Sequence, residues 1–234
     1  MHCSCREIGQ NAHMSHTAFP VIPLTAPILD GKFVRLEPLT MGHVVDLTNA
    51  AAEDPTCFGL HRIPHEKISM YRWVDAAIGL RGRHDPLPYA IRRRDDGRII
   101  GSTRYRQAEF WQRPATGLSM PVKHPDTIEI GHTWLARSAQ RTGCNTEAKL
   151  LMLQHAFESW SVKRVTMTTD SRDDRSRSAI ERIGARLDGV LRSAGPAPDD
   201  SIGDVAVYTI LYQEWSLIRS NLEQRLNRAD AVPC

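Results

Sequence analysis

The sequence contains no long run of hydrophobic residues. A membrane-spanning helix needs roughly 20 consecutive apolar residues, and no segment of the 234 residues comes near that length. The first residues also lack the continuous apolar stretch of a secretory signal, because polar residues such as Arg6, Glu7 and Gln10 interrupt it. We therefore expect a cytoplasmic protein that has no membrane-embedded part.

The chain also has no large excess of charge and no cysteine framework. Its 30 basic and 27 acidic residues leave a formal net charge of +3, which gives little support for a nucleic-acid partner. The five cysteines are an odd number without regular spacing, so we expect reduced thiols. Cys3 and Cys5 form one C-x-C pair with no second cysteine pair, so we predict no metal site.

What is present is the composition of a folded globular protein, with 41% hydrophobic and 24% charged residues. We predict a single domain over residues 28–226, because no repeat and no change of composition marks an internal boundary. Residues 1–27 contain three prolines and show no periodicity, so they are predicted to be a disordered N-terminal tail. Residues 227–234 are predicted to be a C-terminal tail. Met14 is an alternative natural start.

The hydrophobic pattern predicts an α/β fold with a mixed, mostly antiparallel sheet of six or seven strands and helices on both faces. The pair Asp96-Gly97 between two β-prone runs predicts a tight hairpin. Residues 112–125 are rich in proline and are predicted to be a connecting loop. The predicted strands lie at about 33–36, 87–93, 98–105, 127–135, 165–169, 187–191 and 205–211, and the predicted helices at 41–52, 64–80, 145–160, 175–183 and 213–226.

The strand over 127–135 carries a carboxylate near its middle. Regular alternation would place Glu129, Gly131 and Thr133 on one face of the sheet and Ile128, Ile130 and Trp134 on the other. The strand leads into a polar turn, Gln140 to Asn145, and then into the predicted helix over 145–160, in which Leu150, Leu153, Phe157 and Trp160 form an apolar stripe.

This turn has the features of an anion site. A glycine-containing turn lets backbone N–H groups converge, the helix N-terminus adds partial positive charge, and Arg141 adds a full charge, so the turn suits a pyrophosphate. Alternatively, Gly143 is there only for its conformational freedom. The Gly-Lys-Ser/Thr ending of a P-loop and the G-x-G-x-x-G of dinucleotide folds are both absent.

Together these residues resemble the GCN5-related N-acetyltransferase (GNAT) family, and most closely its branch of ribosomal-protein N-terminal acetyltransferases. The resemblance covers about 29–215, and it rests on the strand 129–135, the segment 140–149 and the segment 170–185. Gln140 and Gly143 match the acetyl-CoA signature of the family, whereas Asn145 stands where Gly or Ala is usual. Asp173 stands where relatives usually have Asn.

The resemblance implies that acetyl-CoA is the cofactor. The pantetheine arm would lie along the strand edge at Thr133, Trp134 and Leu135, and the contact usually made by Asn would fall to Asp173. The pyrophosphate would be held by the backbone amides of Arg141, Thr142, Gly143, Cys144 and Asn145, and Gln140 is a further cofactor-binding residue of the same turn.

The expected chemistry assigns roles to two further side chains. A protonated amine with a pKa near ~10 must lose a proton before it attacks a thioester, and Glu129 is the candidate base. The alternative is that Glu129 lies on a solvated strand face. A backbone N–H near Trp134 or Leu135 would stabilise the oxyanion. Ser176 matches the position of the family's acid for the thiolate, although it is equally suited to the start of a helix.

We therefore predict an acetyl-CoA-dependent N-acetyltransferase that acts on a primary amine, either a protein N-terminus or a small molecule, by direct attack in a ternary complex. The alternative is a non-catalytic acyl-CoA-binding or sensing module that keeps the GNAT fold. The arginine run 92–94 is expected to be a solvated strand edge, or to guide an acidic acceptor. The C-terminal helix and Trp215 suggest a homodimer.

Overall fold

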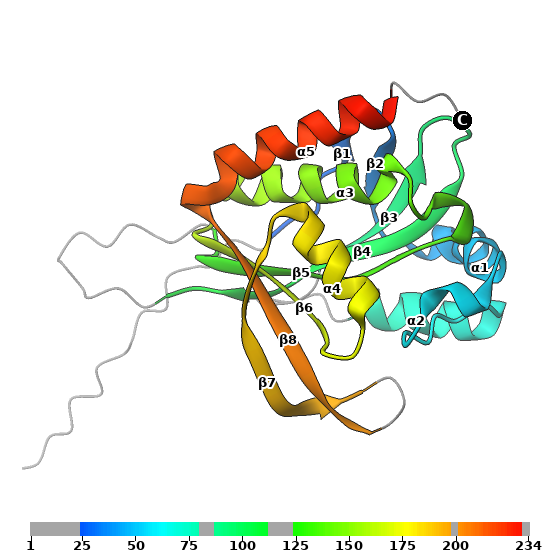
Figure 1. Ribbon diagram of the computed structural model, residues 1–234. Helices are drawn as coiled ribbons and strands as arrows, with labels where there is room; N and C mark the ends of the chain where they lie inside the picture. Colours follow the sequence, from blue (N-terminus) through cyan, green and yellow to red (C-terminus); the bar gives the residue numbers. More distant parts are fainter. Residues whose placement is uncertain (1–23, 80–86, 112–123, 198–200, 231–234) are drawn as a thin grey trace, which may run out of the picture.

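The computed structural model describes residues 24–79, 87–111, 124–197 and 201–230 (Figure 1). Residues 1–23, with Cys3, Cys5 and Met14, and most of the predicted loop 112–125 lie outside the described residues. The strands are β1 (Leu29–Asp30), β2 (Val34–Pro38), β3 (Leu87–Arg93), β4 (Ile99–Glu109), β5 (Thr127–Leu135), β6 (Arg164–Asp170), β7 (Arg186–Pro196) and β8 (Ile202–Leu211). The α-helices are α1 (Val44–Ala52), α2 (Lys67–Gly79), α3 (Gly143–Gln154), α4 (Asp174–Ile183) and α5 (Trp215–Asp230).

The described strands form one eight-stranded sheet in the order β1-β2-β3-β4-β5-β6-β8-β7. All neighbours are antiparallel except β5 and β6, which are parallel. The predicted α/β class and mixed, mostly antiparallel sheet are confirmed. The strand count of six or seven was too low by at least one, because the two-residue β1 is too short to give an alternating pattern.

The helices cover both faces of the sheet, and each face has its own hydrophobic cluster. Helices α3 and α5 run side by side over one face (Figure 1), where the stripe predicted for α3 is buried at Leu150, Leu153, Phe157 and Trp160. Helices α1 and α2 form the second cluster with Trp134 of β5. Trp134 therefore faces away from α3.

Local signals at turns and helix ends are confirmed. Gly97 adopts a φ of 69° in the β3–β4 hairpin, and Gly184 ends α4 at a φ of 107°. At the C-terminus, however, α5 continues to Asp230, so the predicted tail over 227–234 begins inside a helix. Trp215 is buried and packs on Phe157 with ring centroids 5.5 Å apart, so this residue is not available to a dimer surface.

The parallel strands β5 and β6 separate soon after they meet. They pair over only three positions, Thr127–Glu129 with Arg164–Thr166, although β5 continues to Leu135. Since the strands are parallel, the helices that follow them, α3 and α4, both begin at the end of the sheet where the strands diverge. This divergence leaves the later part of β5 unpaired with β6 and places the N-termini of α3 and α4 at the same end of the sheet.

A buried carboxylate on α3 secures the β1–β2 turn. Glu147 Oε1 accepts from the amide of Lys32 at 2.8 Å, and Oε2 accepts from the amides of Phe33 and Val34 at 2.6 and 2.7 Å. A Cβ at Gly31 would lie 2.5 Å from the Glu147 carboxyl carbon, so glycine lets this turn approach the helix closely.

We expect Glu147→Ala to lower the free energy of unfolding by about 3 kcal/mol, because up to three backbone donors lose their acceptor. Urea unfolding measures this change. Glu223→Ala is the control, since Glu223 forms a surface ion pair with Arg219 and should cost less than about 1 kcal/mol. Equal losses in the two variants would show that the turn finds other acceptors.

Candidate active site

Glu129 lies at the point where β5 and β6 separate, and its side chain is only 2% exposed. Thr168 Oγ1 of β6 donates to Glu129 Oε1 at 2.9 Å, and Arg106 Nε of β4 lies 3.6 Å from Oε2. With its amide oriented to satisfy both neighbours, Gln107 Nε2 donates to Oε2 at 2.6 Å. Burial raises the pKa of Glu129, against the opposing charge of Arg106. The alternative of a solvated strand face is therefore wrong.

Gly131 gives this carboxylate room to lie over its own strand. A Cβ at position 131 would be 3.0 Å from Glu129 Oε1, which is tighter than an ordinary van der Waals contact. The glycine in the motif thus positions the carboxylate.

A β-bulge at His132 interrupts the alternation of β5. Ser102 pairs with Trp134 and Arg104 with Gly131, so two residues of β5 oppose one of β4, and His132 has a positive φ of 48°. The extra residue shifts the side-chain phase by one position. The predicted faces are therefore right for Glu129 and wrong beyond the bulge.

After the bulge, Thr133 faces α3 and Trp134 faces the α1–α2 side. Lys149 Nζ of α3 donates to Thr133 Oγ1 at 2.5 Å, whereas the Trp134 ring packs edge-on against Phe58 at 5.6 Å. Leu135 joins the cluster under α3. The side chains of the three residues predicted to bind pantetheine thus lie on the two faces of the sheet, Thr133 and Leu135 on the α3 side and Trp134 on the α1–α2 side.

The turn before α3 leads into a helix N-terminus with a side-chain cap. Thr142 is the N-cap: its Oγ1 accepts from the Cys144 amide at 3.2 Å and donates to the Ala139 carbonyl at 2.7 Å. The first amides of an α-helix lack intrahelical acceptors, and Arg141 has a left-handed φ of 63°. Of the predicted amides, that of Cys144 is therefore already hydrogen-bonded, and that of Gln140 donates to the Arg137 carbonyl at 3.3 Å. The remaining amides of the turn suit a pyrophosphate.

Two members of the predicted set have buried polar atoms. The Oδ1 of Asn145 is buried with no hydrogen-bond partner in the described part of the chain. Cys144 is buried as well, and desolvation raises the pKa of its thiol, which does not suit a nucleophile.

Gln140 ties three segments together beside the turn. Its Nε2 donates to the Leu135 carbonyl at 2.9 Å and lies 3.1 Å from Cys57 Sγ. Its Oε1 accepts from Arg175 Nη2 of α4 at 2.5 Å, and Arg175 Nη1 donates to the Cys57 carbonyl at 2.5 Å. Sequence reasoning missed Arg175 and Cys57, because contacts between residues 118 positions apart leave no local signal.

The start of α4 holds the other two predicted residues. Asp173 is the N-cap and accepts from the amide and the hydroxyl of Ser176 at 2.9 and 2.7 Å. His61 Nε2, from the segment before α2, lies 3.3 Å from Asp173 Oδ2. Ser176 therefore occupies the helix-start position that was its alternative role. Sequence reasoning did not pair His61 with this end of the sheet.

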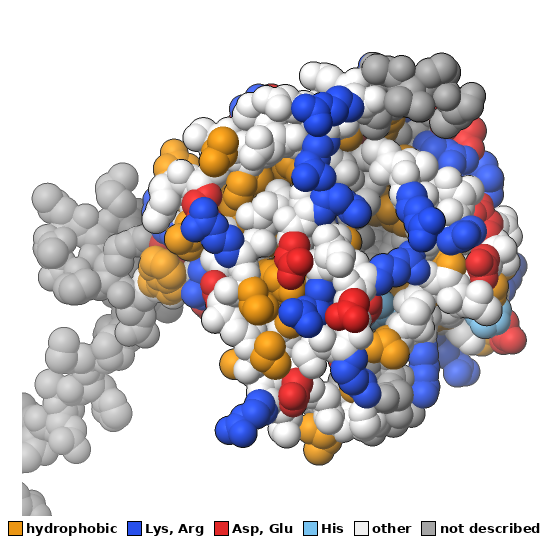
Figure 2. Space-filling model, viewed as in Figure 1, with side chains coloured by type: hydrophobic (Ala, Val, Ile, Leu, Met, Phe, Trp, Pro, Cys, Tyr) orange, Lys and Arg blue, Asp and Glu red, His pale blue; other side chains and the backbone are white. Residues whose placement is uncertain are grey.

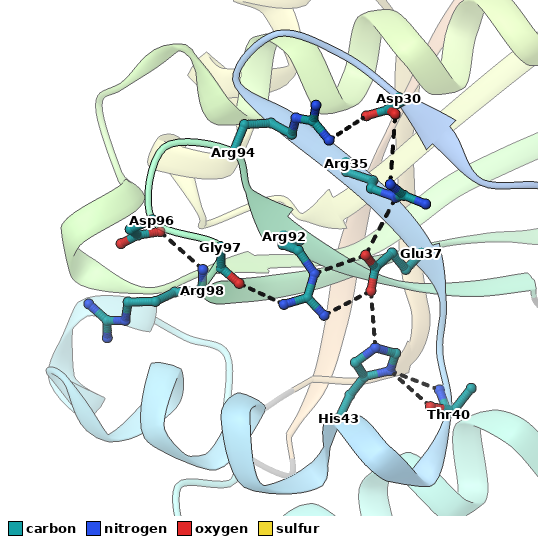
Figure 3. Close-up of polar contacts among 10 residues, drawn as sticks. All are labelled: Asp30, Arg35, Glu37, Thr40, His43, Arg92, Arg94, Asp96, Gly97 and Arg98. Atoms are coloured by element: carbon teal, nitrogen blue, oxygen red, sulfur yellow. Dashed lines mark hydrogen bonds and ion pairs between the residues drawn. The ribbon is translucent and has the colours of Figure 1, made fainter.

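The arginine run of β3 is paired within the chain (Figure 3). Arg92 donates to both carboxylate oxygens of Glu37, at 2.9 and 3.0 Å, and to the Gly97 carbonyl at 2.6 Å. These hydrogen bonds lower the pKa of Glu37. Arg94 Nη1 lies 3.2 Å from Asp30 Oδ1. The prediction of a solvated strand edge is therefore wrong, because β3 pairs with β2 on one side and β4 on the other and the arginines are held by neighbouring carboxylates.

Comparison with known proteins identifies the family. The profile of the acetyltransferase (GNAT) domain matches residues 34–186, and the chain belongs to this family. Bacillus subtilis (strain 168) YdaF, whose assignment as a ribosomal N-acetyltransferase is itself provisional, is 31% identical over 87 residues, which are 37% of this chain and 46% of YdaF. The chain thus matches about half the length of this curated relative.

Solved structures share the fold. A GCN5-related N-acetyltransferase from Brucella melitensis has a TM-score of 0.73 at 24% identity, covering 90% of each chain. RimJ from Mycobacterium smegmatis, determined with CoA-disulfide, has a TM-score of 0.64 at 20% identity, covering 82% of this chain and 88% of RimJ. At these identities, the two structures show that the chain shares their fold.

Members of this family use acetyl-CoA as their cofactor. The N-terminus of α3 fits the diphosphate of this cofactor, because the amides on either side of Cys144 have no partner recorded in the described part of the chain. Within the described ranges, no helix is long and apolar enough to cross a membrane, and no three His, Cys, Asp or Glu side chains gather as a metal site.

Proposed function

We propose that the protein is an N-acetyltransferase that transfers an acetyl group from acetyl-CoA to a primary amine, with both substrates bound at once. The acceptor is a protein N-terminus or a small-molecule amine. The observation that carries the proposal is the buried Glu129 carboxylate at the divergence of β5 and β6, the arrangement of a base that acts in a water-poor site. Acetyl-CoA supplies the acetyl group as an activated thioester.

The chain's own residues hold the cofactor at two places in this proposal. The amides of residues 141–145 bind the diphosphate, and the backbone of Thr133, Trp134 and Leu135 binds the pantetheine arm along the edge that β6 leaves unpaired. Asp173 contributes less than the usual Asn would. An ionised carboxylate cannot donate a hydrogen bond, and this one already accepts from Ser176.

Glu129 accepts the proton of the attacking amine, directly or through one water. Its raised pKa brings it closer to that of the ammonium group, so proton transfer is less uphill. The bulge at His132 turns backbone N–H groups of β5 away from the regular ladder, near the proposed oxyanion position at Trp134 or Leu135. Ser176 is the proposed acid for the thiolate, and its hydroxyl must first turn away from Asp173.

We propose one catalytic domain over residues 28–226, a cytoplasmic location and a homodimer that does not use Trp215. On the face in Figure 2, basic side chains form short groups separated by acidic, apolar and uncharged ones. That distribution gives no continuous basic tract on this face and does not favour a nucleic-acid partner.

A coenzyme A release assay over a panel of amines and N-terminal peptides, together with calorimetric titration of CoA, tests the function. We expect CoA to bind and acetyl-CoA to be consumed with at least one amine. Tight CoA binding without turnover of any acyl-CoA would favour the alternative, a binding or sensing module. Absence of CoA binding would overturn both.

A further inference from the structure

Arg104 of β4 is a buried guanidinium without a counter-charge. The residue is only 6% exposed, and its Nε has no hydrogen-bond partner in the described part of the chain. No carboxylate of those residues is recorded within ion-pair distance of it. Burial, together with the charge of Arg106, lowers the pKa of Arg104 to about 10. A buried charge of this kind is costly to keep unless something pairs with it.

The guanidinium lies over an aromatic ring that also contacts the proposed cofactor strand. Its central carbon is 5.0 Å from the centroid of the Trp73 ring of α2. Trp73 meets Trp134 edge-on at 6.4 Å, and the Nε1 of Trp134 is likewise buried without a partner among the described residues. Two buried donors without acceptors thus flank one ring.

The two buried donors of Arg104 and Trp134 lie close to Glu129, the proposed base. Arg104 pairs with Gly131 across the β4–β5 ladder, and the Glu129 carboxylate lies over Gly131. Paired residues of an antiparallel ladder have Cα atoms only about 5 Å apart. An acceptor whose amine meets Glu129 therefore passes close to Arg104.

Arg106, the neighbouring arginine on β4, differs from Arg104 because it has partners for its guanidinium. Arg106 lies beside Glu129, and its Nη1 is 2.6 Å from His132 Nε2. Burial and the two arginines lower the pKa of His132 to about 4, so this imidazole is neutral at pH 7 and accepts from Arg106. Of these two arginines, only Arg104 has no hydrogen-bond acceptor recorded among the described residues.

We propose that the acetyl acceptor is an amine that carries an anionic group, a carboxylate in the simplest case, and that Arg104 binds this group over Trp73. The inference rests on the proposed amine acetylation and adds the substrate class. A planar guanidinium pairs with a carboxylate through two parallel hydrogen bonds, so the anion would supply both the missing charge and the missing acceptors.

Calorimetry on the CoA-bound protein tests this with matched probes. One pair is the amidated peptides Ser-Glu-Ala-Ala and Ser-Gln-Ala-Ala, and the other is β-alanine and propylamine. In at least one pair, the acidic member should bind about 10- to 100-fold more tightly, the range expected for hydrogen bonds between charged groups. The pair with the larger ratio shows whether a peptide or a small amine is the source of the anion.

Three variants connect the preference to Arg104. Arg104→Met should abolish it without weakening the neutral probe, and Arg104→Lys, which keeps the charge, should retain part of it. Arg98→Met is the control, because Arg98 is exposed and paired with Glu53; it should leave the preference unchanged. Urea unfolding confirms that each variant is folded.

A preference absent from wild type, or one that persists in folded Arg104→Met, would overturn the inference. Failure of both acidic probes to bind would also overturn it. The proposed function fails separately: if the acidic probes bind in an Arg104-dependent way but no acceptor in the panel is acetylated, the acceptor site stands and the transferase assignment does not.

Discussion

Replacing Glu129 with Gln is expected to lower kcat for amine acetylation by about 100- to 1,000-fold, the contribution typical of a positioned general base. Gln keeps the size of the side chain and can still accept from Thr168, whose Oγ1 donates to Glu129 at 2.9 Å. The fold and the affinity for CoA should therefore change little. Steady-state kinetics and CoA titration separate the two effects.

The pH profile gives an independent check on the same residue. Glu129 acts as a base only when ionised, and burial raises its pKa above the ordinary value of 4.5. In wild type, kcat/KM should therefore fall as the pH falls through this raised pKa, and the corresponding limb should be missing in Glu129→Gln.

Glu109→Gln is the matched control, because this carboxylate lies near the end of β4 and is 59% exposed. Its rate should stay within about twofold of wild type, since it has no place in the proposed proton transfer. An equal rate loss in both variants, or no loss in Glu129→Gln, would contradict the role of Glu129 as base.

Replacing Lys149 with Met is expected to stabilise the protein at neutral and lower pH. Lys149 is only 5% exposed and donates to Thr133 and Thr103 hydroxyls at 2.5 and 3.3 Å, with no carboxylate recorded beside it among the described residues. Desolvation lowers its pKa from 10.5 to about 7. Met fills a similar volume and carries no charge to desolvate.

The sign of the pH dependence follows from proton binding. Between about pH 7 and 10.5 the unfolded chain keeps a proton on Lys149 that the folded chain has lost, so wild-type stability rises with pH in this window. Each pH unit contributes about 1.4 kcal/mol. Below pH 7 both states are protonated and this dependence ends. The advantage of Lys149→Met should therefore be largest at pH 7 or below and shrink toward pH 10.

Urea unfolding at pH 7, 8.5 and 10 measures this trend in both proteins. Lys163→Met is the control, since Lys163 is exposed. This variant removes the same charge from a side chain that is not desolvated in the folded protein. If the change in the free energy of unfolding relative to wild type has the same pH dependence in both variants, the result would show that Lys149 is not desolvated.

The sequence by itself determined the elements whose signals are local. Strands 87–93 and 127–135 have the predicted bounds, because alternation and flanking turn residues are written in the chain itself. Gly97 and Gly184 mark their turns because few other residues tolerate a positive φ. The family motif likewise located the carboxylate at Glu129, whereas the helix predicted to start at residue 145 begins two residues earlier, at Gly143.

The tertiary structure decided which side chains meet in the site. The bulge at His132 depends on the register of β5 against β4, which packing on both faces of the sheet selects, so the faces of Thr133 and Trp134 could not be read from alternation. The bridge from Arg175 to Cys57 and the isolation of Arg104 depend on contacts between distant segments. Such contacts are fixed by burial of the whole chain, and no short stretch of sequence carries their signal.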